Sequence, residues 1–128
     1  MTKLIDTNVL LRLLIGDVPE QRDRALGWLD PAPGGSVLVI DAVLVELLFQ
    51  LESRSGYGLP RSTHLPRVRT LLQSECFLLE AASWTALDLM GTHPKLDFAD
   101  CLLIARSRST ADAVVLSFDR ELIRVAGT

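Results

Sequence analysis

The chain has 128 residues, 48% of them apolar, and a formal net charge of −3. A chain of this length buries roughly two-thirds of its unfolded surface, so it is long enough for one self-sufficient core, and its apolar content argues against disorder. The acidic balance excludes a uniformly basic nucleic-acid binder, although local basic patches would still allow contact with a polyanion.

Strand-like and helix-like segments alternate along the chain. In chain order the predicted elements are a strand at 2–6, helices at 7–15 and 19–30, a strand at 36–40, helices at 41–54 and 61–74, a strand at 76–79, helices at 82–90 and 97–107, a strand at 113–117 and a short last helix from 118–122. This alternation predicts one α/β domain, residues 1–128, with a mostly parallel sheet.

Local sequence signals predict where three of the helices start, end or bend, and one further strand. Asp41 is predicted to be the N-cap of its helix, and Gly91 to end the helix before it. Pro66 lies inside a predicted helix, so that helix is expected either to be kinked or to start later. Ala113-Val114-Val115-Leu116-Ser117 (113–117) is expected to form a buried strand, because it is short, apolar and rich in branched residues.

The two cysteines argue for a reducing compartment. Cys76 and Cys101 belong to no CxxC or Cys/His array, which argues against zinc, and Cys101 is expected to be a buried free thiol. The polar side chains that interrupt the apolar N-terminus argue against a signal peptide. The longest apolar region, residues 37–51, is too short and too often interrupted for a membrane span. A cytoplasmic protein is therefore expected.

Five acidic residues are the candidates for chemistry. Asp6 and Asp119 each follow a predicted strand, so both would lie at the carboxyl edge of a parallel sheet. Glu46 lies in an apolar helix, while Asp97 and Asp100 share one helix face three residues apart. Helix capping explains each aspartate equally well, and a solvent-facing stripe explains Glu46.

The joint pattern carries more information than any single acid. Carboxylates that converge repel one another by several kcal/mol at intermediate dielectric, unless some are protonated or a cation binds. An all-oxygen ligand set without His or Cys suits Mg²⁺ or Mn²⁺. Such a site most often serves phosphate chemistry, because the cation lowers the pKa of a water and screens the charge on the phosphate.

Other polar and aromatic residues have weaker interpretations. Thr7, Asn8 and Ser117 suit supporting hydrogen bonds, or simple turn and cap roles. The histidines and tryptophans are interpreted as follows: His64 and His93 as exposed or loop residues, Trp28 and Trp84 as core or interface residues rather than stacking platforms. The acid-free stretch 53–74 contains four arginines, which form either a solvated helix face or a surface that attracts phosphates.

The motifs together resemble the PIN-domain nucleases. They are Asp6-Thr7-Asn8-Val9-Leu10, Glu46 in its apolar helix, Asp97-Phe98-Ala99-Asp100 followed by Cys101-Leu102-Leu103-Ile104-Ala105, and Ser117-Phe118-Asp119. Within that family the chain is similar to the VapC toxins of bacterial VapBC toxin–antitoxin pairs. The chain departs from the family where Arg106-Ser107-Arg108 replaces small residues and where Ser117 replaces a common threonine.

The resemblance implies a three-layer α/β/α PIN-like fold and a Mg²⁺- or Mn²⁺-dependent endoribonuclease. It makes Asp6 and Asp100 the main metal ligands, with Glu46 and Asp119 completing the catalytic set and Asp97 assisting or capping. Water as the nucleophile would leave a 5′-phosphate and a 3′-hydroxyl. It also implies a structured RNA substrate such as a tRNA, a VapB-like antitoxin held in an apolar groove, and a homodimer. The groove would draw on Leu10, Leu11, Leu13 and Leu14, which otherwise are ordinary core residues.

Two other classes of protein share part of this pattern. A phosphoaspartate or phosphatase domain needs an acidic pair or an Asp-x-Asp motif and a later lysine, whereas this chain has Asp6-Thr7-Asn8 and only two lysines, Lys3 and Lys95. A catalytically silent PIN-like domain that binds RNA or protein is the alternative, and the four retained acids count against it.

Overall fold

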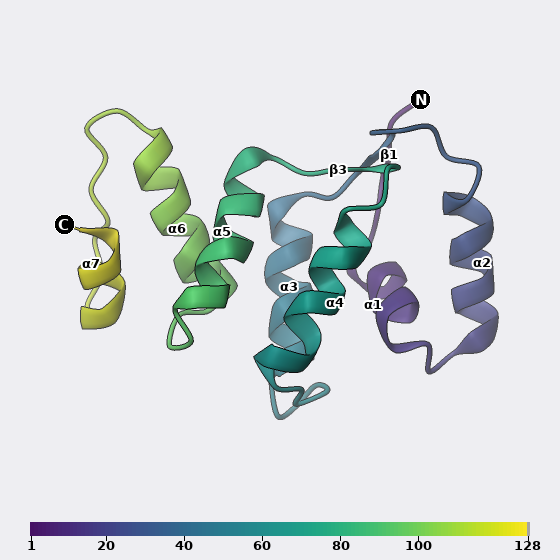
Figure 1. Cartoon of the computed structure of the whole chain (residues 1–128), viewed down its shortest axis with the longest axis horizontal. Helices are drawn as coiled ribbons and strands as arrows, with labels where there is room; N and C mark the ends of the chain where they lie inside the picture. Colours follow the sequence, from purple (N-terminus) through teal and green to yellow (C-terminus); the bar gives the residue numbers. More distant parts are fainter. Residues whose placement is uncertain (128) are drawn as a thin grey trace. The chain divides into compact units, whose positions relative to one another are not determined.

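The computed structural model describes residues 1–127 (Figure 1). Its elements, in chain order, are β1 (Lys3–Leu4), α1 (Thr7–Ile15), α2 (Pro19–Leu29), β2 (Val37–Leu38), α3 (Asp41–Glu52), α4 (Arg61–Leu72), β3 (Phe77–Leu78), α5 (Ala81–Thr92), α6 (Phe98–Ser109) and α7 (Arg120–Ala126). They form two compact units, Met1–Leu79 and a second that begins at Glu80.

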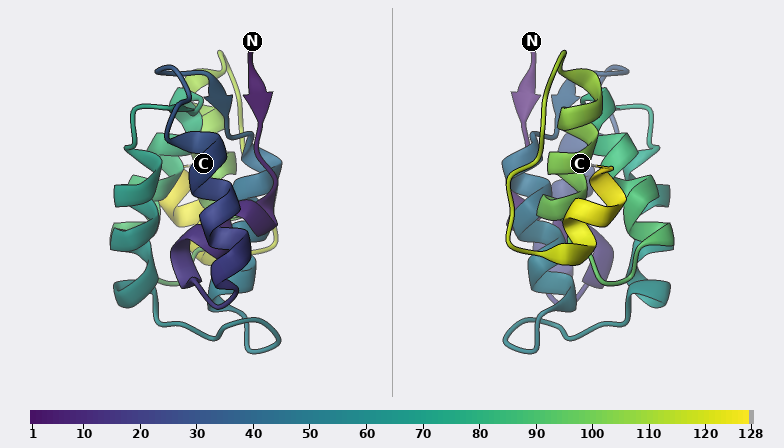
Figure 2. Two further views of the ribbon diagram at one scale, coloured as in Figure 1. Left: turned by 90° about the vertical axis from the view of Figure 1, so that its right-hand side faces the viewer. Right: turned by 90° about the vertical axis from the view of Figure 1, so that its left-hand side faces the viewer.

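The first unit contains a parallel three-stranded sheet in the order β1-β2-β3. Lys3 pairs with Val37, which pairs with Phe77 in turn. Helix α1 packs against α2, α3 and α4 (Figure 1), and the left panel of Figure 2 shows α2 beside α1 with β1 leading into α1. The α/β class and the parallel sheet predicted from the sequence are therefore confirmed.

Apolar faces of the helices form the core of this unit. The largest fully buried side chains come from α1, α3 and α4, namely Leu10, Leu11, Leu44, Leu47, Leu48, Leu51 and Leu72. Fully burying a leucine stabilises the folded state by about 1.5–3 kcal/mol, so this cluster supplies much of the driving force for the unit. Leu10 and Leu11 are thus core residues, whereas Leu13 and Leu14 are half-buried.

A polar cluster joins the end of α3 to the start of α4. Arg61 donates two hydrogen bonds to Glu52, both of 2.9 Å, and His64 Nε2 donates a third to Glu52 Oε2 at 2.9 Å, because a carboxylate only accepts. The expectation of an exposed or loop histidine is wrong for His64, which is 2% exposed within α4. Pairing with the carboxylate offsets the cost of burying the imidazole.

The second unit consists of three helices. Helix α5 packs against α6, and α7 lies against α6 in the right panel of Figure 2. Phe98, Leu87 and Met90 are among its largest fully buried side chains. The predicted strand at 113–117 is wrong: these residues form no strand, and Val114 and Leu116 are 64% and 91% exposed. A strand needs a neighbour for its backbone hydrogen bonds, and the described residues of this unit contain no other strand.

Two boundary predictions also fail, those for Gly91 and Asp41. Helix α5 continues through Gly91 to Thr92, because a single glycine lowers helix stability by about 1 kcal/mol without breaking the helix. Ile40, not Asp41, is the N-cap of α3, and Asp41 occupies the first helical position. Helix α4 starts at Arg61 as predicted and contains Pro66, which excludes the later start and leaves the kink as a prediction. Both cysteines are buried free thiols, as predicted for Cys101.

Candidate active site

Asp6 lies between the end of β1 and the start of α1. It is the N-cap of that helix, in extended conformation, and its Oδ1 accepts a 2.8 Å hydrogen bond from the Thr7 amide. The capping alternative is thus what the structure shows. The side chain is nevertheless exposed, and one amide bond leaves most of its lone pairs free for another partner.

Glu46 belongs to the same local network as Asp6. It lies on α3 with an exposed side chain, and the Thr7 hydroxyl is 3.4 Å from both Glu46 Oε2 and the Val43 carbonyl oxygen. On the other side, Gln50 Nε2 donates to Glu46 Oε1 at 3.0 Å. Thr7 therefore links the two predicted acids, with its amide on Asp6 and its hydroxyl against Glu46.

Asp97 and Asp100 form a capping box at the start of α6. Asp97 is the N-cap and its Oδ1 accepts from the Asp100 amide at 2.8 Å, while Asp100 Oδ2 accepts from the Asp97 amide at 3.3 Å. Each carboxylate is thus oriented by the backbone of the other residue. The i, i+3 spacing in the sequence is the signature of this motif.

Asp119 is the N-cap of α7. Its Oδ1 accepts from the amides of Glu121 at 2.9 Å and Leu122 at 3.2 Å, and its own amide donates to Ser117 Oγ at 2.9 Å. Ser117 therefore holds the backbone of the acid rather than its carboxylate. The helix amides explain why the acid lies at this position without any strand before it.

The acids of the second unit influence one another. Burial raises the pKa of Asp100, and the charges of Asp97 and Asp119 raise it further. The local field therefore disfavours the ionised form of Asp100, and a cation would relieve this repulsion. Within residues 1–127, no three His, Cys, Asp or Glu side chains gather in an arrangement ready to hold a metal.

The hydrogen bonds and charge effects described above divide the predicted acids into two sets, each inside one unit. One set is Asp6 with Glu46, and the other is Asp97, Asp100 and Asp119. Gln50 is a further member that sequence reasoning assigned only to a polar stripe. The i, i+4 spacing from Glu46 is the signal that could have found it.

The predicted basic surface is partly used inside the fold. Arg61 and His64 bind Glu52, so they are not available to a phosphate. Arg54 and Arg67 remain exposed.

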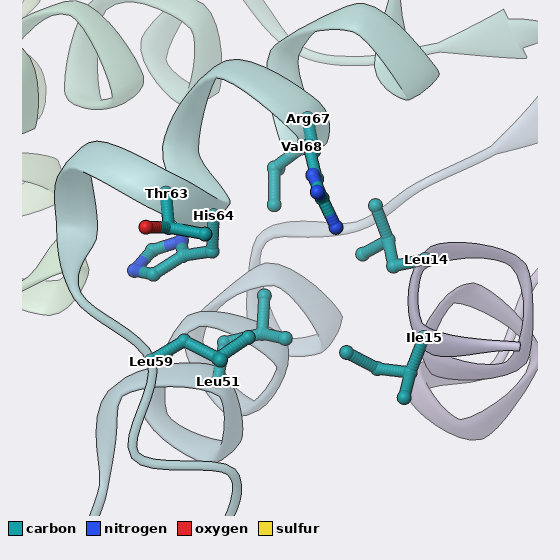
Figure 3. Close-up of a pocket in the computed structure, with 8 residues that line it drawn as sticks. All are labelled: Leu14, Ile15, Leu51, Leu59, Thr63, His64, Arg67 and Val68. Carbon is teal, nitrogen blue, oxygen red and sulfur yellow. The ribbon is translucent and has the colours of Figure 1, made fainter. Parts of the chain in front are cut away.

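Arg67 borders an apolar cavity of about 190 Å³. Figure 3 shows Leu14 and Ile15 of α1 on one side and the α4 residues on the other, with the Arg67 side chain reaching between the helices. The remaining wall residues are Leu51, Leu59, Thr63, His64 and Val68.

The chain belongs to the PIN-domain family, whose model matches residues 3–128. Together with the parallel sheet and the seven helices of the described residues, this match confirms the predicted PIN-like α/β/α fold class. PIN domains are usually nucleases, and those nucleases typically use divalent metals. No curated protein and no solved structure gives a significant match to the chain. No helix in residues 1–127 has the length and apolar character needed to span a membrane.

Proposed function

We propose that this protein is a Mg²⁺- or Mn²⁺-dependent endoribonuclease that acts as the toxin of a VapBC-type toxin–antitoxin pair. The observation that carries the proposal is the PIN match over residues 3–128 in a chain that keeps an acid at each motif position. The catalytic set is Asp6, Glu46, Asp100 and Asp119.

The side chains present suit a divalent cation. All the candidate ligands are carboxylates, which are the donors that Mg²⁺ and Mn²⁺ prefer. Asp6 and Asp100 are the proposed ligands, with Glu46, Asp119 and Asp97 in support. The raised pKa of Asp100 fits this assignment, because a carboxylate crowded by like charges gains most from a nearby cation.

The roles of the chain's own groups follow from their hydrogen bonds. Main-chain amides at three helix starts orient the carboxylates of Asp6, Asp100 and Asp119, and for Asp100 the donor is the Asp97 amide. Glu46, aligned by Gln50 and Thr7, is the group suited to orient a water or accept its proton. A divalent cation, when bound, supplies an acidified water and screens the charge that develops on the phosphate.

The decisive experiment compares an acid variant that keeps its cap with a matched control. Asp6→Asn retains an acceptor for the Thr7 amide, so the fold should persist while RNA cleavage with Mn²⁺ falls at least 100-fold. Glu20→Gln changes another exposed acid in the first turn of a helix and should cleave like the wild type. The products should carry 5′-phosphates and 3′-hydroxyls.

Two results would contradict the enzyme. One is RNA left intact by the wild type with every divalent metal tried, which would favour a silent RNA-binding PIN domain. The other is equal cleavage by wild type and Asp6→Asn. Growth arrest on induction that disappears in Asp6→Asn is the expected support for the toxin role.

The antitoxin proposal rests on the cavity between α1 and α4. Its apolar walls and its Arg67 rim suit an amphipathic segment that carries an acid. We expect the product of a short neighbouring reading frame to copurify with the protein and to silence it. Leu14→Asp should lose this complex and keep RNA cleavage, and an unchanged complex would count against the assignment of this groove.

A further inference from the structure

Trp28 is exposed, which excludes the core alternative of its prediction and is compatible with the interface alternative. It lies near the end of α2 and half of its surface, 50%, is accessible. Two hollows meet at it, because Trp28 and Val9 line both. Asp6 lines one hollow, of about 360 Å³, and Arg24 lines the other, of about 160 Å³. We call the combined depression the Trp28 trough.

Apolar side chains form most of the trough, and its charged groups are mainly cations. Lys3, Arg12 and Arg24 line it, and Asp6 is its single acid. Arg12 is fixed by hydrogen bonds to Asp17 at 3.0 Å and to Gln21 at 2.8 Å. Arg24 has no ion pair among residues 1–127, and its guanidinium carbon lies 5.6 Å from the centre of the Trp28 ring.

We infer that the Trp28 trough is a nucleotide subsite, in which a base of single-stranded RNA stacks on Trp28 and a phosphate next to it pairs with Arg24. The Arg24 guanidinium lies over one face of the indole, so the other face is the one offered to a base, and the same guanidinium supplies the charge that a backbone phosphate needs. Lys3 and Arg24 lie along the same walls, and their charge suits a polyanion such as a nucleic-acid backbone.

This inference rests on the proposed ribonuclease function. It assumes that the scissile phosphodiester bond lies at Asp6, and it places the neighbouring nucleotide in the Trp28 trough. A stacked base on one side of Asp6 would fix the register of the strand in the active site. Binding energy from this contact would be shared by the bound substrate and the transition state, so Trp28 is expected to affect KM more than kcat.

The first measurement isolates Trp28 by its fluorescence. The chain has two tryptophans, so Trp84→Phe leaves Trp28 as the only indole. With EDTA present to prevent cleavage, a 12-nucleotide single-stranded RNA of mixed sequence should quench this emission saturably. Trp28→Phe is the matched control, because it keeps only Trp84, whose emission should not respond to the RNA.

The second measurement compares the RNA affinity of variants at Trp28 and Arg24. Trp28→Leu should bind the RNA about ten-fold more weakly, and Trp28→Phe should stay within about three-fold of the wild type, because it keeps a ring for stacking. Arg24→Gln should weaken binding and lower the salt dependence by about one counterion. Thermal melts of each variant establish that the fold is retained.

The outcomes separate this inference from the enzyme proposal. Unchanged Trp28 emission, or equal RNA affinity in Trp28→Leu, in a protein that still cleaves RNA would overturn the subsite and assign this face to protein contacts. Saturable quenching in a protein that cleaves no RNA would support the subsite while overturning the nuclease.

Discussion

Thr7 contributes two groups to the acids of the first unit. Its amide donates to Asp6 Oδ1 at 2.8 Å, and its hydroxyl is 3.4 Å from Glu46 Oε2. The residue is 2% exposed, so its position is fixed by the packing of α1 on α3. A buried hydroxyl in this position can orient the Glu46 carboxylate, so we propose that Thr7 is a positioning residue.

Thr7→Val tests this role, because it keeps the shape of the side chain and removes the hydroxyl. Groups that orient metal-ligating side chains typically contribute 10–100-fold to activity, so we expect RNA cleavage to fall about 10-fold. Thr7→Ser restores the hydroxyl and should recover most of the rate. Equal rates in Thr7→Val and the wild type, measured on the same RNA with Mn²⁺, would remove Thr7 from the site.

At the scale of elements, Glu52 ties α3 to α4. Burial raises the pKa of Glu52, but the hydrogen bonds and charges of Arg61 and His64 outweigh it and lower the pKa below the ordinary 4.5. An acid whose pKa is lowered on folding stabilises the fold above its unfolded pKa. That contribution is present above about pH 4.5 and is lost as the pH falls through the folded value.

Glu52→Gln should therefore lower the free energy of unfolding by about 1–2 kcal/mol at pH 7, because the charged hydrogen bonds disappear. The difference from the wild type should shrink as the pH drops below 4.5, where the wild-type carboxyl is also losing its charge. Urea titrations at pH 7 and pH 3.5 measure the difference in the free energy of unfolding between the variant and the wild type. Glu121→Gln breaks an exposed pair with Arg124 and should cost nothing measurable. A pH-independent difference would contradict the assignment.

The elements that the sequence predicts well carry their own local signals. Helix α1 is capped by Asp6 at its start and by Gly16 at its end, where a φ of 69° suits glycine. Both capping residues can be recognised from the sequence. Residues 113–117 have an apolar pattern but no strand partner in their own unit, and that partnership is not a local property. His64 was mistaken for an exposed or loop residue because its partner, Glu52, is twelve residues away.

The candidate site was predictable to a similar degree. The sequence analysis selected Asp6 and Asp119 because each follows a predicted strand, and the other three acids because of their places in predicted helices; the strand expected before Asp119 does not form. What the sequence could not supply is the links between them. Thr7 meets Glu46 across 39 residues, and the charge of Asp119 reaches Asp100 from another helix.

For the whole molecule, the net charge of −3 hides an uneven distribution. The acids gather in two sets, Asp6 with Glu46 and Asp97 with Asp100 and Asp119, while cations such as Arg24 and Arg67 line separate hollows. We propose that the acids bind a divalent cation and that the hollow lined by Arg24 attracts a phosphate. A nuclease needs both, because its metal ligands would otherwise repel the substrate.

Divalent metal should stabilise the whole molecule through these acids. A ligand that binds only the folded state raises its stability by RT ln(1 + [L]/Kd), so 10 mM Mn²⁺ with a Kd of about 1 mM would add roughly 1.4 kcal/mol. For a chain of this size the melting temperature should rise by about 2–6 °C. Thermal unfolding is followed by circular dichroism, and the same protein in EDTA gives the metal-free melting temperature.

Removing a ligand should abolish the shift, because the remaining acids hold the ion less tightly. Asp6→Asn and Asp100→Asn are each expected to lose most of the Mn²⁺-dependent rise, whereas Glu20→Gln, an acid outside both sets, should keep it. Asp100→Asn should also melt higher than the wild type in EDTA at pH 7, since it removes a charge that Asp97 and Asp119 repel. A rise of equal size in the wild type and in both variants would mean that Mn²⁺ binds elsewhere, and the proposed ligand set would be wrong.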